Sequence, residues 1–258
     1  MTIAKPDQPI VLFGFGPKFD LPEASPFVAK TETQLRMAGL PYHKNLTGRA
    51  EAPKGKLPYI RDGAAIVADS TFIRQHLEWS YGVDFDAGYD LAQRALAWSI
   101  ERLLEDHLYW IAMKFRWLDP DNFAKGPAHF FDGAPAEIRD RLRNEAREAV
   151  RQRMLGYGIG RHADEDILFL ATHSLYSLAT LLGDKPYLLG ERPCGTDATA
   201  LAMLAAIMTP FFPGELRDTA MSFDNLYPYV LRMLEKYYPD FDLAGWPEVK
   251  RPSLSCVA

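Results

Sequence analysis

The hydrophobic pattern divides this chain into a mixed first part and a helical second part. Short apolar runs at 10–15, 42–46 and 57–60 have the length and composition of strands. The pair at 62–63, Asp-Gly, is typical of a two-residue hairpin turn, and a return strand is expected at 64–67. Two stretches between these runs repeat apolar residues at helical spacing, so the first part alternates strands and helices.

From about residue 88 onward the pattern is helical. The expected helices run at about 88–117, 135–156, 163–183, 196–208 and 223–237. The segment 83–87 is the expected linker. We therefore expect two domains, an α/β domain at 1–82 and an all-α domain at 88–258, with the ligand cleft between them.

Composition is that of an ordinary globular protein. The 258 residues are 48% apolar and 24% charged, and the net charge of −5 argues against a nucleic-acid partner. Cys194 and Cys256 are too few for a disulfide framework and indicate a reducing, cytoplasmic location. The N-terminus has no apolar signal core, the longest apolar stretch (198–208) is too short to span a bilayer, and the polar C-terminal tail carries no lipidation signal. No membrane anchor is therefore expected.

Three other kinds of site do not fit the sequence. The run Gly14-Phe15-Gly16 lacks the third glycine of a dinucleotide-binding loop, because Phe19 stands in its place. The six histidines are scattered, without HExxH or CxxC spacing, so no metal site is expected. Ser174 follows a histidine, but no GxSxG motif surrounds it, which argues against a serine hydrolase.

Ser25 is the first candidate for binding chemistry. It precedes Pro26 and an apolar-periodic stretch, which predicts a helix N-cap with proline at the first helical position. A hydroxyl there lies beside unpaired N–H groups and the positive end of the helix dipole, where a thiolate would be stabilised. Taken alone, Ser-Pro is more typical of a plain helix cap.

Two further segments are candidates. Leu57-Pro58 opens a strand, where proline belongs because it cannot donate to a ladder. Most X-Pro bonds are trans, whereas a cis bond here would turn the preceding N–H and carbonyl outward toward a peptide ligand. Asp69-Ser70 opens the next helix, and both residues are ordinary caps as well as suitable partners for an amino-acid head group.

Several runs of the sequence resemble the cytosolic glutathione S-transferase superfamily, and most closely its failed-axon-connections and metaxin-like branch. These runs are SPFVAKTETQLRMAGLPY (25–42), PKGKLPYIRDG (53–63), ADSTFIRQHLE (68–78), EDHLYW (105–110), GIGRH (158–162) and LGDKPYLLGERP (182–193). The resemblance covers nearly the whole chain. It implies a thioredoxin-like N-terminal domain, an all-helical C-terminal domain, glutathione as co-substrate, a homodimer and a role in detoxification.

The resemblance also implies a role for each candidate segment. Ser25 would be the catalytic contact that donates to the glutathione sulfur. A cis Leu57-Pro58 would present backbone to the cysteinyl part, and Asp69-Ser70 would hold the γ-glutamyl group. Lys56 is a weaker candidate for the glycyl carboxylate. The expected glutathione-binding residues are Phe27, Lys56, Leu57, Pro58, Asp69 and Ser70.

Two features depart from the family pattern. The loop at 16–24, between the first strand and Ser25, is longer than usual, so another of its side chains could replace Ser25 as the sulfur contact. Cys194 stands where the family has Ser or Thr, three residues before Asp197 at the start of a buried helix. Because cysteine is a poor acceptor, we expect half of the reciprocal capping arrangement to be weakened there.

The helix around 98–117 is expected to supply the second wall of the cleft. Trp98, Arg102, Glu105 and Tyr109 fall on one helical stripe. Core packing is the usual role of an aromatic residue at such a position. The functional alternative is an apolar pocket for an electrophile, and its candidates are Tyr109, Trp110 and Phe115, among which the sequence does not choose.

These features favour an enzyme in which glutathione thiolate attacks a small hydrophobic electrophile or a peroxide. Lowering a thiol pKa by about two units corresponds to about 2.7 kcal/mol of thiolate stabilisation, which a hydroxyl, a helix N-terminus and a few N–H groups could supply. Without a cysteine at position 25, mixed-disulfide reduction is less expected. The alternative is a non-catalytic glutathione-binding or protein-interaction scaffold of the metaxin-like type, since fold alone does not settle function.

Overall fold

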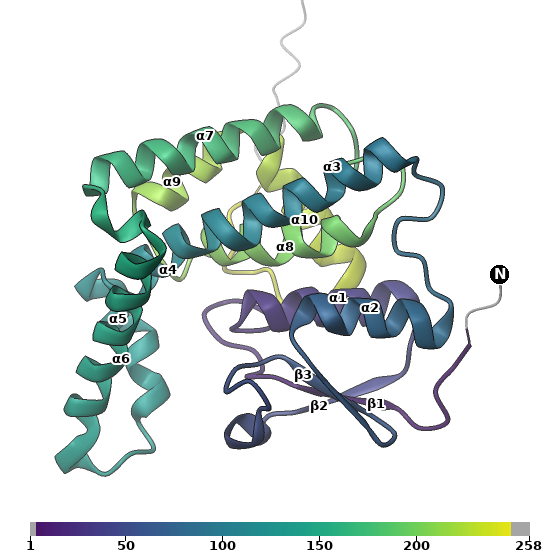
Figure 1. Ribbon diagram of the computed structural model, residues 1–258. Coiled ribbons are helices and arrows are strands. Elements are labelled where there is room, and N and C mark those ends of the chain that lie inside the picture. The colour runs from purple at the N-terminus through teal and green to yellow at the C-terminus, as the bar shows by residue number, and fades with distance from the viewer. Residues whose placement is uncertain (1–3, 249–258) are drawn as a thin grey trace, which may run out of the picture.

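In the computed structural model, which describes residues 4–248, the first part of the chain forms a four-stranded sheet (Figure 1). Cys256 and the C-terminal tail lie outside the described residues. The strands are β1 (Ile10–Phe13), β2 (Tyr42–Asn45), β3 (Tyr59–Asp62) and β4 (Ala65–Ala68). Their order across the sheet is β2-β1-β3-β4; β1 pairs parallel with β2 and antiparallel with β3, and β3 pairs antiparallel with β4.

Local sequence determines how these elements begin and end. The parallel pair β1–β2 needs a crossover, which helix α1 (Pro26–Ala38) supplies. β1 ends at Phe13 rather than at residue 15. In the β3–β4 hairpin, Asp62 pairs with Ala65, so the two loop residues are Gly63 and Ala64 rather than the expected 62–63. Gly63 has a φ of +56°, which glycine adopts without a steric penalty.

Helices α1 and α2 (Ser70–Tyr81) lie on one face of the sheet, between the sheet and the helical second part (Figure 1). Their inward side chains pack against β1 and β3 in a fully apolar layer. Its members include Ile10, Leu12, Val28, Leu35, Ile60, Ile73 and Leu77. The other face of the sheet carries a smaller cluster around Phe13 and Tyr59, next to a single 3₁₀ turn, η1 (Gly48–Glu51).

The second part consists of helices throughout. They are α3 (Leu91–Arg102), the π-helix η2 (Leu103–Leu108), α4 (Tyr109–Trp117), α5 (Pro120–Lys125), the 3₁₀ turn η3 (Pro127–Phe131), α6 (Ala136–Tyr157), the 3₁₀ turn η4 (Ile159–Arg161), α7 (Asp164–Leu182), α8 (Gly195–Met208), α9 (Glu215–Met221) and α10 (Leu226–Tyr237). The expected helix at 88–117 is therefore two α-helices with a π-helical turn between them. The short elements α5, η3 and α9 were not predicted, because they fall below the length at which periodicity is readable.

Helix α8 is the centre of the second part. Every residue from Gly195 to Met208 is buried, and α8 packs against α1, α3 and α10. Both partners of the capping box are in position, and the carboxylate half is formed: the Cys194 N–H donates to the Asp197 carboxylate at 2.8 Å. On the cysteine half, the Asp197 N–H donates to the Cys194 carbonyl at 3.0 Å, so the weaker contribution expected of the sulfur stays a prediction. Within residues 4–248, no helix has the combination of length and apolar character needed to cross a membrane.

Buried ion pairs join the two parts of the chain. Lys30 of α1 contacts Glu105 of η2 at 2.6 Å and Glu101 of α3 at 3.2 Å. Arg74 of α2 contacts the same Glu101 at 2.7 Å. Because all of these carboxylates are buried, the pairs hold α1 and α2 against α3 and η2 in a defined position.

Candidate functional site

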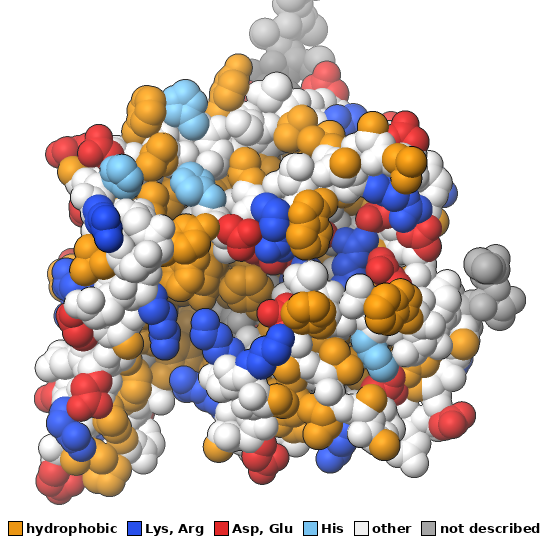
Figure 2. All heavy atoms as spheres, viewed as in Figure 1, with side chains coloured by type: hydrophobic (Ala, Val, Ile, Leu, Met, Phe, Trp, Pro, Cys, Tyr) orange, Lys and Arg blue, Asp and Glu red, His pale blue; other side chains and the backbone are white. Residues whose placement is uncertain are grey.

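A cleft of about 800 Å³ lies between the sheet part and the helices of the second part. One wall is made by the start of α1, the loop before β3 and the start of α2. The other wall is made by the α3–η2–α4 helix and by α6, which extends alongside the sheet part in Figure 1. Figure 2 shows this region as a hollow with hydrophobic side chains in its floor and basic side chains around its rim.

Ser25 is the N-cap of α1, as predicted. Its backbone is extended, and its hydroxyl oxygen accepts from the Val28 N–H at 3.5 Å. The hydroxyl lines the cleft, and its own proton has no acceptor among residues 4–248. The geometry thus provides a free O–H donor beside the first N–H groups of a helix, where negative charge is stabilised.

The long loop before Ser25 is organised around a buried carboxylate. Glu23 accepts hydrogen bonds from the N–H groups of Phe15 (3.2 Å), Gly16 (2.9 Å) and Ser25 (3.3 Å). Burial raises the pKa of Glu23, and Lys44 together with these N–H groups opposes the rise. Glu23 therefore fixes the position of the Ser25 backbone.

The loop itself offers no polar side chain to the cleft. Of residues 16–24, Phe19 and Ala24 line the cleft, and neither can donate a hydrogen bond to sulfur. The side chain of Phe19 is buried against Phe130, Phe211 and Phe212. The geometry therefore favours Ser25 over the loop alternative for the sulfur contact.

The Leu57-Pro58 segment lies on the same wall as Ser25. The Leu57-Pro58 bond is cis, as the resemblance implies. The Pro58 carbonyl accepts from the Asp69 N–H at 3.2 Å, whereas the Leu57 N–H and carbonyl have no partner among residues 4–248. An extended peptide could pair with these two free backbone groups.

Asp69 and Ser70 complete this wall. Asp69 has a φ of +86°, a conformation that residues other than glycine rarely adopt and that recurs at ligand sites. One of its carboxylate oxygens accepts from the Thr71 N–H at 3.0 Å. Ser70 is buried in the cleft wall, and its hydroxyl has no partner within the described chain. Phe27 and Lys56 also line the cleft.

The second wall follows one helical stripe. Arg102, Glu105, Tyr109, Met113 and Arg116 line the cleft at spacings of three and four, directly through the π-helical turn. Tyr109 and Trp110 both line it. The centroids of the Tyr109 and Phe27 rings, which belong to opposite walls, are 4.8 Å apart. Trp98 is exposed outside the cleft, where it stacks on the Arg102 guanidinium.

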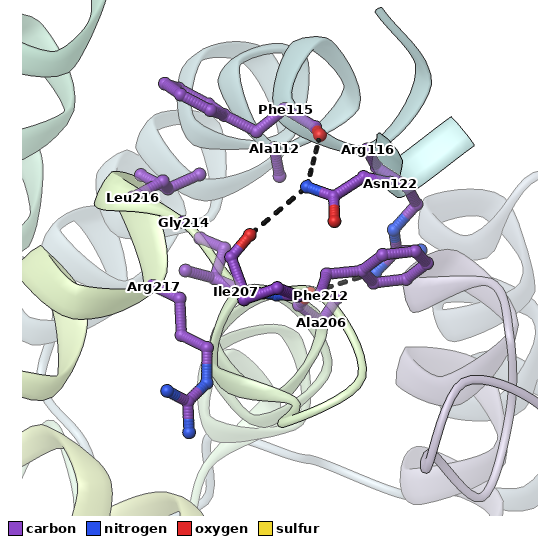
Figure 3. A pocket seen from close by; sticks show the side chains of 11 residues that line it. Ala112, Phe115, Arg116, Asn122, Ala206, Ile207, Phe212, Gly214, Leu216 and Arg217 are labelled. Atoms are coloured by element: carbon purple, nitrogen blue, oxygen red, sulfur yellow. Dashed lines mark hydrogen bonds between the residues drawn. The ribbon is translucent and has the colours of Figure 1, made fainter. Parts of the chain in front are cut away.

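Phe115 does not line the cleft. It borders a separate small pocket, in which the Asn122 amide donates to the carbonyls of Phe115 at 3.0 Å and Pro213 at 3.2 Å (Figure 3). In Figure 3 the Phe115 ring lies on the opposite side of this pocket from Phe212 and Arg116. Position 115 is off the stripe through 109, 113 and 116, so strict helical spacing would have separated it from Tyr109.

Several residues of the cleft were not predicted from the sequence, among them Arg116, Phe130 and Arg153. Arg116 continues the helical stripe and could have been found from its spacing. Phe130 of η3 and Arg153 of α6 lie beyond a chain reversal, and no local signal marks them. The Arg116 side chain is buried, donates to the carbonyls of Ala24 (3.3 Å) and Ala206 (2.9 Å), and has a pKa that burial lowers to about 10.

Family models match both parts of the chain. The model of the glutathione S-transferase N-terminal domain matches residues 26–122, and that of the C-terminal domain matches residues 171–233. An isoprene-epoxide–glutathione S-transferase of Rhodococcus sp. (strain AD45) is 31% identical over 208 residues, which are 77% of this chain and 86% of the relative. The chain belongs to the glutathione S-transferase family.

Two further relatives place this chain in the expected branch of the family. "Failed axon connections" of Drosophila melanogaster is 30% identical over 249 residues, or 90% of this chain, and the chain spans 59% of that relative's length. Metaxin-2 of Homo sapiens is 23% identical over 210 residues, or 80% of each chain. The resemblance to the failed-axon-connections and metaxin-like branch is confirmed.

Comparison with solved structures confirms the fold. Glutathione transferase GSTFuA3 of Phanerochaete chrysosporium aligns with a TM-score of 0.61 at 18% identity, covering 89% of this chain and 97% of that one. The architecture is a thioredoxin-like domain with a small mixed sheet, followed by an all-helical domain. The family uses glutathione as a co-substrate. Residues 4–248 contain no group of three or more His, Cys, Asp or Glu side chains placed to hold a metal ion.

Proposed function

We propose that this protein is a glutathione transferase in which the thiolate of bound glutathione attacks a small hydrophobic electrophile or a peroxide. The observation that carries the proposal is the convergence of Ser25, Leu57-Pro58 and Asp69-Ser70. They come from three separate elements and line one wall of a single cleft, whose opposite wall is rich in aromatic residues.

Ser25 is the proposed sulfur contact. Its hydroxyl oxygen accepts from the Val28 N–H, and its hydroxyl proton remains available to donate to a thiolate. That donation and the N-terminus of α1 favour the thiolate over the thiol, whose proton passes to solvent. The sulfur then forms a bond to the electrophilic atom, and the leaving atom departs with the bonding electrons.

The remaining residues of this wall fit the rest of glutathione. The free Leu57 N–H and carbonyl can pair with the cysteinyl backbone. Asp69 can accept from the γ-glutamyl ammonium, and Ser70 with the first N–H groups of α2 can donate to the neighbouring carboxylate. Lys56 lies on the same wall and can pair with the glycyl carboxylate.

Calorimetric titration with reduced glutathione tests the proposal. We expect saturable binding of one glutathione per chain. Ser70→Ala removes a buried hydroxyl of the site and should weaken binding about tenfold. Ser80→Ala, on the same helix and bonded only to His76, is the matched control and should leave affinity unchanged. Absence of binding at millimolar glutathione by calorimetry and by a second method would refute the proposal.

The second candidate function is a non-catalytic glutathione-binding or protein-interaction scaffold. The similarity to failed axon connections and Metaxin-2, neither of which is named for an enzymatic activity, favours it. Steady-state assays across electrophile classes separate the two functions: binding of glutathione without turnover of alkyl epoxides, aryl halides or hydroperoxides would support the scaffold.

We further propose that the protein is a cytoplasmic homodimer with a role in detoxification. Exposed hydrophobic side chains on α2 and α3 support the dimer: Trp79 is 77% exposed and Leu91 is 86% exposed, with Phe72 and Trp98 nearby on the same helices. Cys194, a free buried thiol, is consistent with a reducing compartment. Light scattering gives the mass directly, and Trp79→Glu should convert a dimer to a monomer.

A further inference from the structure

The cleft holds more positive charge than glutathione requires. The cationic side chains that line it without an ion pair to a carboxylate among residues 4–248 are Arg49, Lys54, Lys56, Arg116 and Arg153. Arg102 is also in the cleft but pairs with Glu105 and Asp106. Glutathione has two carboxylates and one ammonium group, and the three cations at positions 49–56 lie on its wall. Arg116 and Arg153 lie on the opposite wall and are not needed to neutralise glutathione.

These two arginines line the same cleft as Tyr109. Arg116 follows Tyr109 by two helical turns on the same stripe of α4, and Arg153 reaches the cleft from α6. The Tyr109 hydroxyl makes no hydrogen bond within residues 4–248. Arg116 is 5% exposed and uses only two of its five N–H donors, both on backbone carbonyls.

A buried guanidinium without a carboxylate is costly in a protein interior. Here the acidic residues of the same wall are already occupied, since Glu105 pairs with Lys30 and Arg102. The phenolic O–H of Tyr109, the remaining donors of Arg116 and the guanidinium of Arg153 therefore line the cleft without a carboxylate partner among residues 4–248. Bidentate recognition of a carboxylate is the chemistry to which a guanidinium is best suited.

The surfaces around this group of donors are flat and apolar. Trp110, Trp117, Phe130 and Phe131 line the same half of the cleft, and the Trp117 and Phe130 rings lie 14° from parallel with centroids 6.3 Å apart. A planar, conjugated molecule fits such a surface better than a short aliphatic one. The cleft volume of about 800 Å³ also leaves room for such a ring beside glutathione.

We infer that the electrophile of this transferase is a planar aromatic or conjugated molecule with a carboxylate or a similar anionic group, bound by Tyr109, Arg116 and Arg153. The inference rests on the proposed function, because it names the second substrate of the same site. The anionic group docks at the far side of the cleft and directs the electrophilic carbon toward the sulfur at Ser25.

A matched pair of electrophiles tests the inference. In 4-chloro-3,5-dinitrobenzoate and 4-chloro-3,5-dinitrobenzamide, the glutathione sulfur bonds to the chlorine-bearing carbon, chloride leaves with the bonding electrons, and the thiol proton goes to solvent. The two compounds differ in the charge of one substituent. We compare the ratio of their kcat/KM values between the native protein and a variant. In this comparison the difference in intrinsic reactivity between the two compounds cancels.

The variant is Arg153→Gln, because this side chain is exposed in the cleft and its loss should not disturb folding. We expect the acid-to-amide ratio to fall about tenfold, with the change mainly in KM for the acid. Arg151→Gln, on the same helix, paired with Glu148 and outside the cleft, is the control and should leave the ratio unchanged. An equal ratio in the native protein and in both variants overturns the inference while leaving the transferase function intact.

A binding measurement separates this result from failure of the transferase proposal. The unreactive 3,5-dinitrobenzoate and 3,5-dinitrobenzamide should quench the fluorescence of Trp110 and Trp117 when they enter the cleft. With S-methylglutathione present, we expect the acid to bind about tenfold more tightly than the amide, and Arg153→Gln to remove the preference. A preference without turnover supports the anion site and refutes catalysis, whereas equal affinities refute the anion site.

Discussion

Replacing Lys30 by methionine should destabilise the fold strongly. The sequence around Lys30 is that of an ordinary amphipathic helix and gives no sign of this. The Lys30 side chain is completely buried, with Glu105 at 2.6 Å and Glu101 at 3.2 Å. Lys30→Met fills much of the same volume but leaves two buried carboxylates with one cation fewer. Breaking a buried ion pair in this way costs about 3–5 kcal/mol.

The remaining partners set the expected value at the lower end of that range. Glu101 keeps Arg74 at 2.7 Å, and Glu105 keeps Arg102 at 2.6 Å. We therefore expect Lys30→Met to lower the free energy of unfolding by about 3 kcal/mol at pH 7. As a control, Arg141→Gln removes an exposed pair with Glu145 and should cost less than about 1 kcal/mol.

The pH dependence of this loss provides a second check. Burial alone would raise the pKa of Glu101, but Lys30 and Arg74 more than offset it, so the pKa lies below its ordinary value. The ionised Glu101 therefore contributes stability above about pH 4.5, and this contribution is lost as pH falls through the lowered pKa. Without Lys30 the pKa of Glu101 rises, and the carboxyl group can take up a proton in the folded state.

Urea unfolding at pH 7 and pH 5 measures both effects. The difference in unfolding free energy between the native protein and Lys30→Met should be smaller at pH 5 than at pH 7. If Lys30→Met costs no more than Arg141→Gln at pH 7, the buried pairs do not hold the two parts together, and the reasoning from burial is wrong.

Three further predictions concern the cleft. Ser25→Ala should raise the pKa of the bound glutathione thiol by about one unit, measured from thiolate absorbance against pH; an unchanged pKa would remove Ser25 from the sulfur contact. Burial raises the pKa of Glu23, despite Lys44 and three N–H donors. The stability that Glu23 contributes to the fold is therefore fully present below about pH 4.5 and is lost as pH rises through the raised pKa. Glu23→Gln should therefore abolish that decline in unfolding free energy, and a persistent decline would contradict the assignment. Trp110→Ala should raise KM for the electrophile, whereas Phe115→Ala should reduce thermal stability and leave KM unchanged; equal KM effects would contradict the placement of the two side chains.

The sequence by itself determined the features that depend on near neighbours. Ser25 caps α1 through a contact three residues away, Asp69 caps α2 through Thr71, and the β3–β4 hairpin follows from a short loop that contains Gly63. Such features depend on backbone geometry over a few residues, so residue type and spacing are sufficient to predict them. Helical spacing likewise placed Tyr109 on the stripe that lines the cleft, whereas it did not choose between Trp110, which lines the cleft, and Phe115, which does not.

Tertiary structure decided the features that depend on distant partners. Lys30 belongs to an ordinary amphipathic helix in sequence, and it is buried because its two carboxylates lie 71 and 75 residues further along the chain. Phe130 and Arg153 reach the cleft because the chain reverses between α4 and α6, which no periodicity encodes. Burial and charge pairing are properties of the packed elements together. For that reason the two arginines that line the cleft without a carboxylate partner, Arg116 and Arg153, and with them the proposed substrate class, became visible only in the folded molecule.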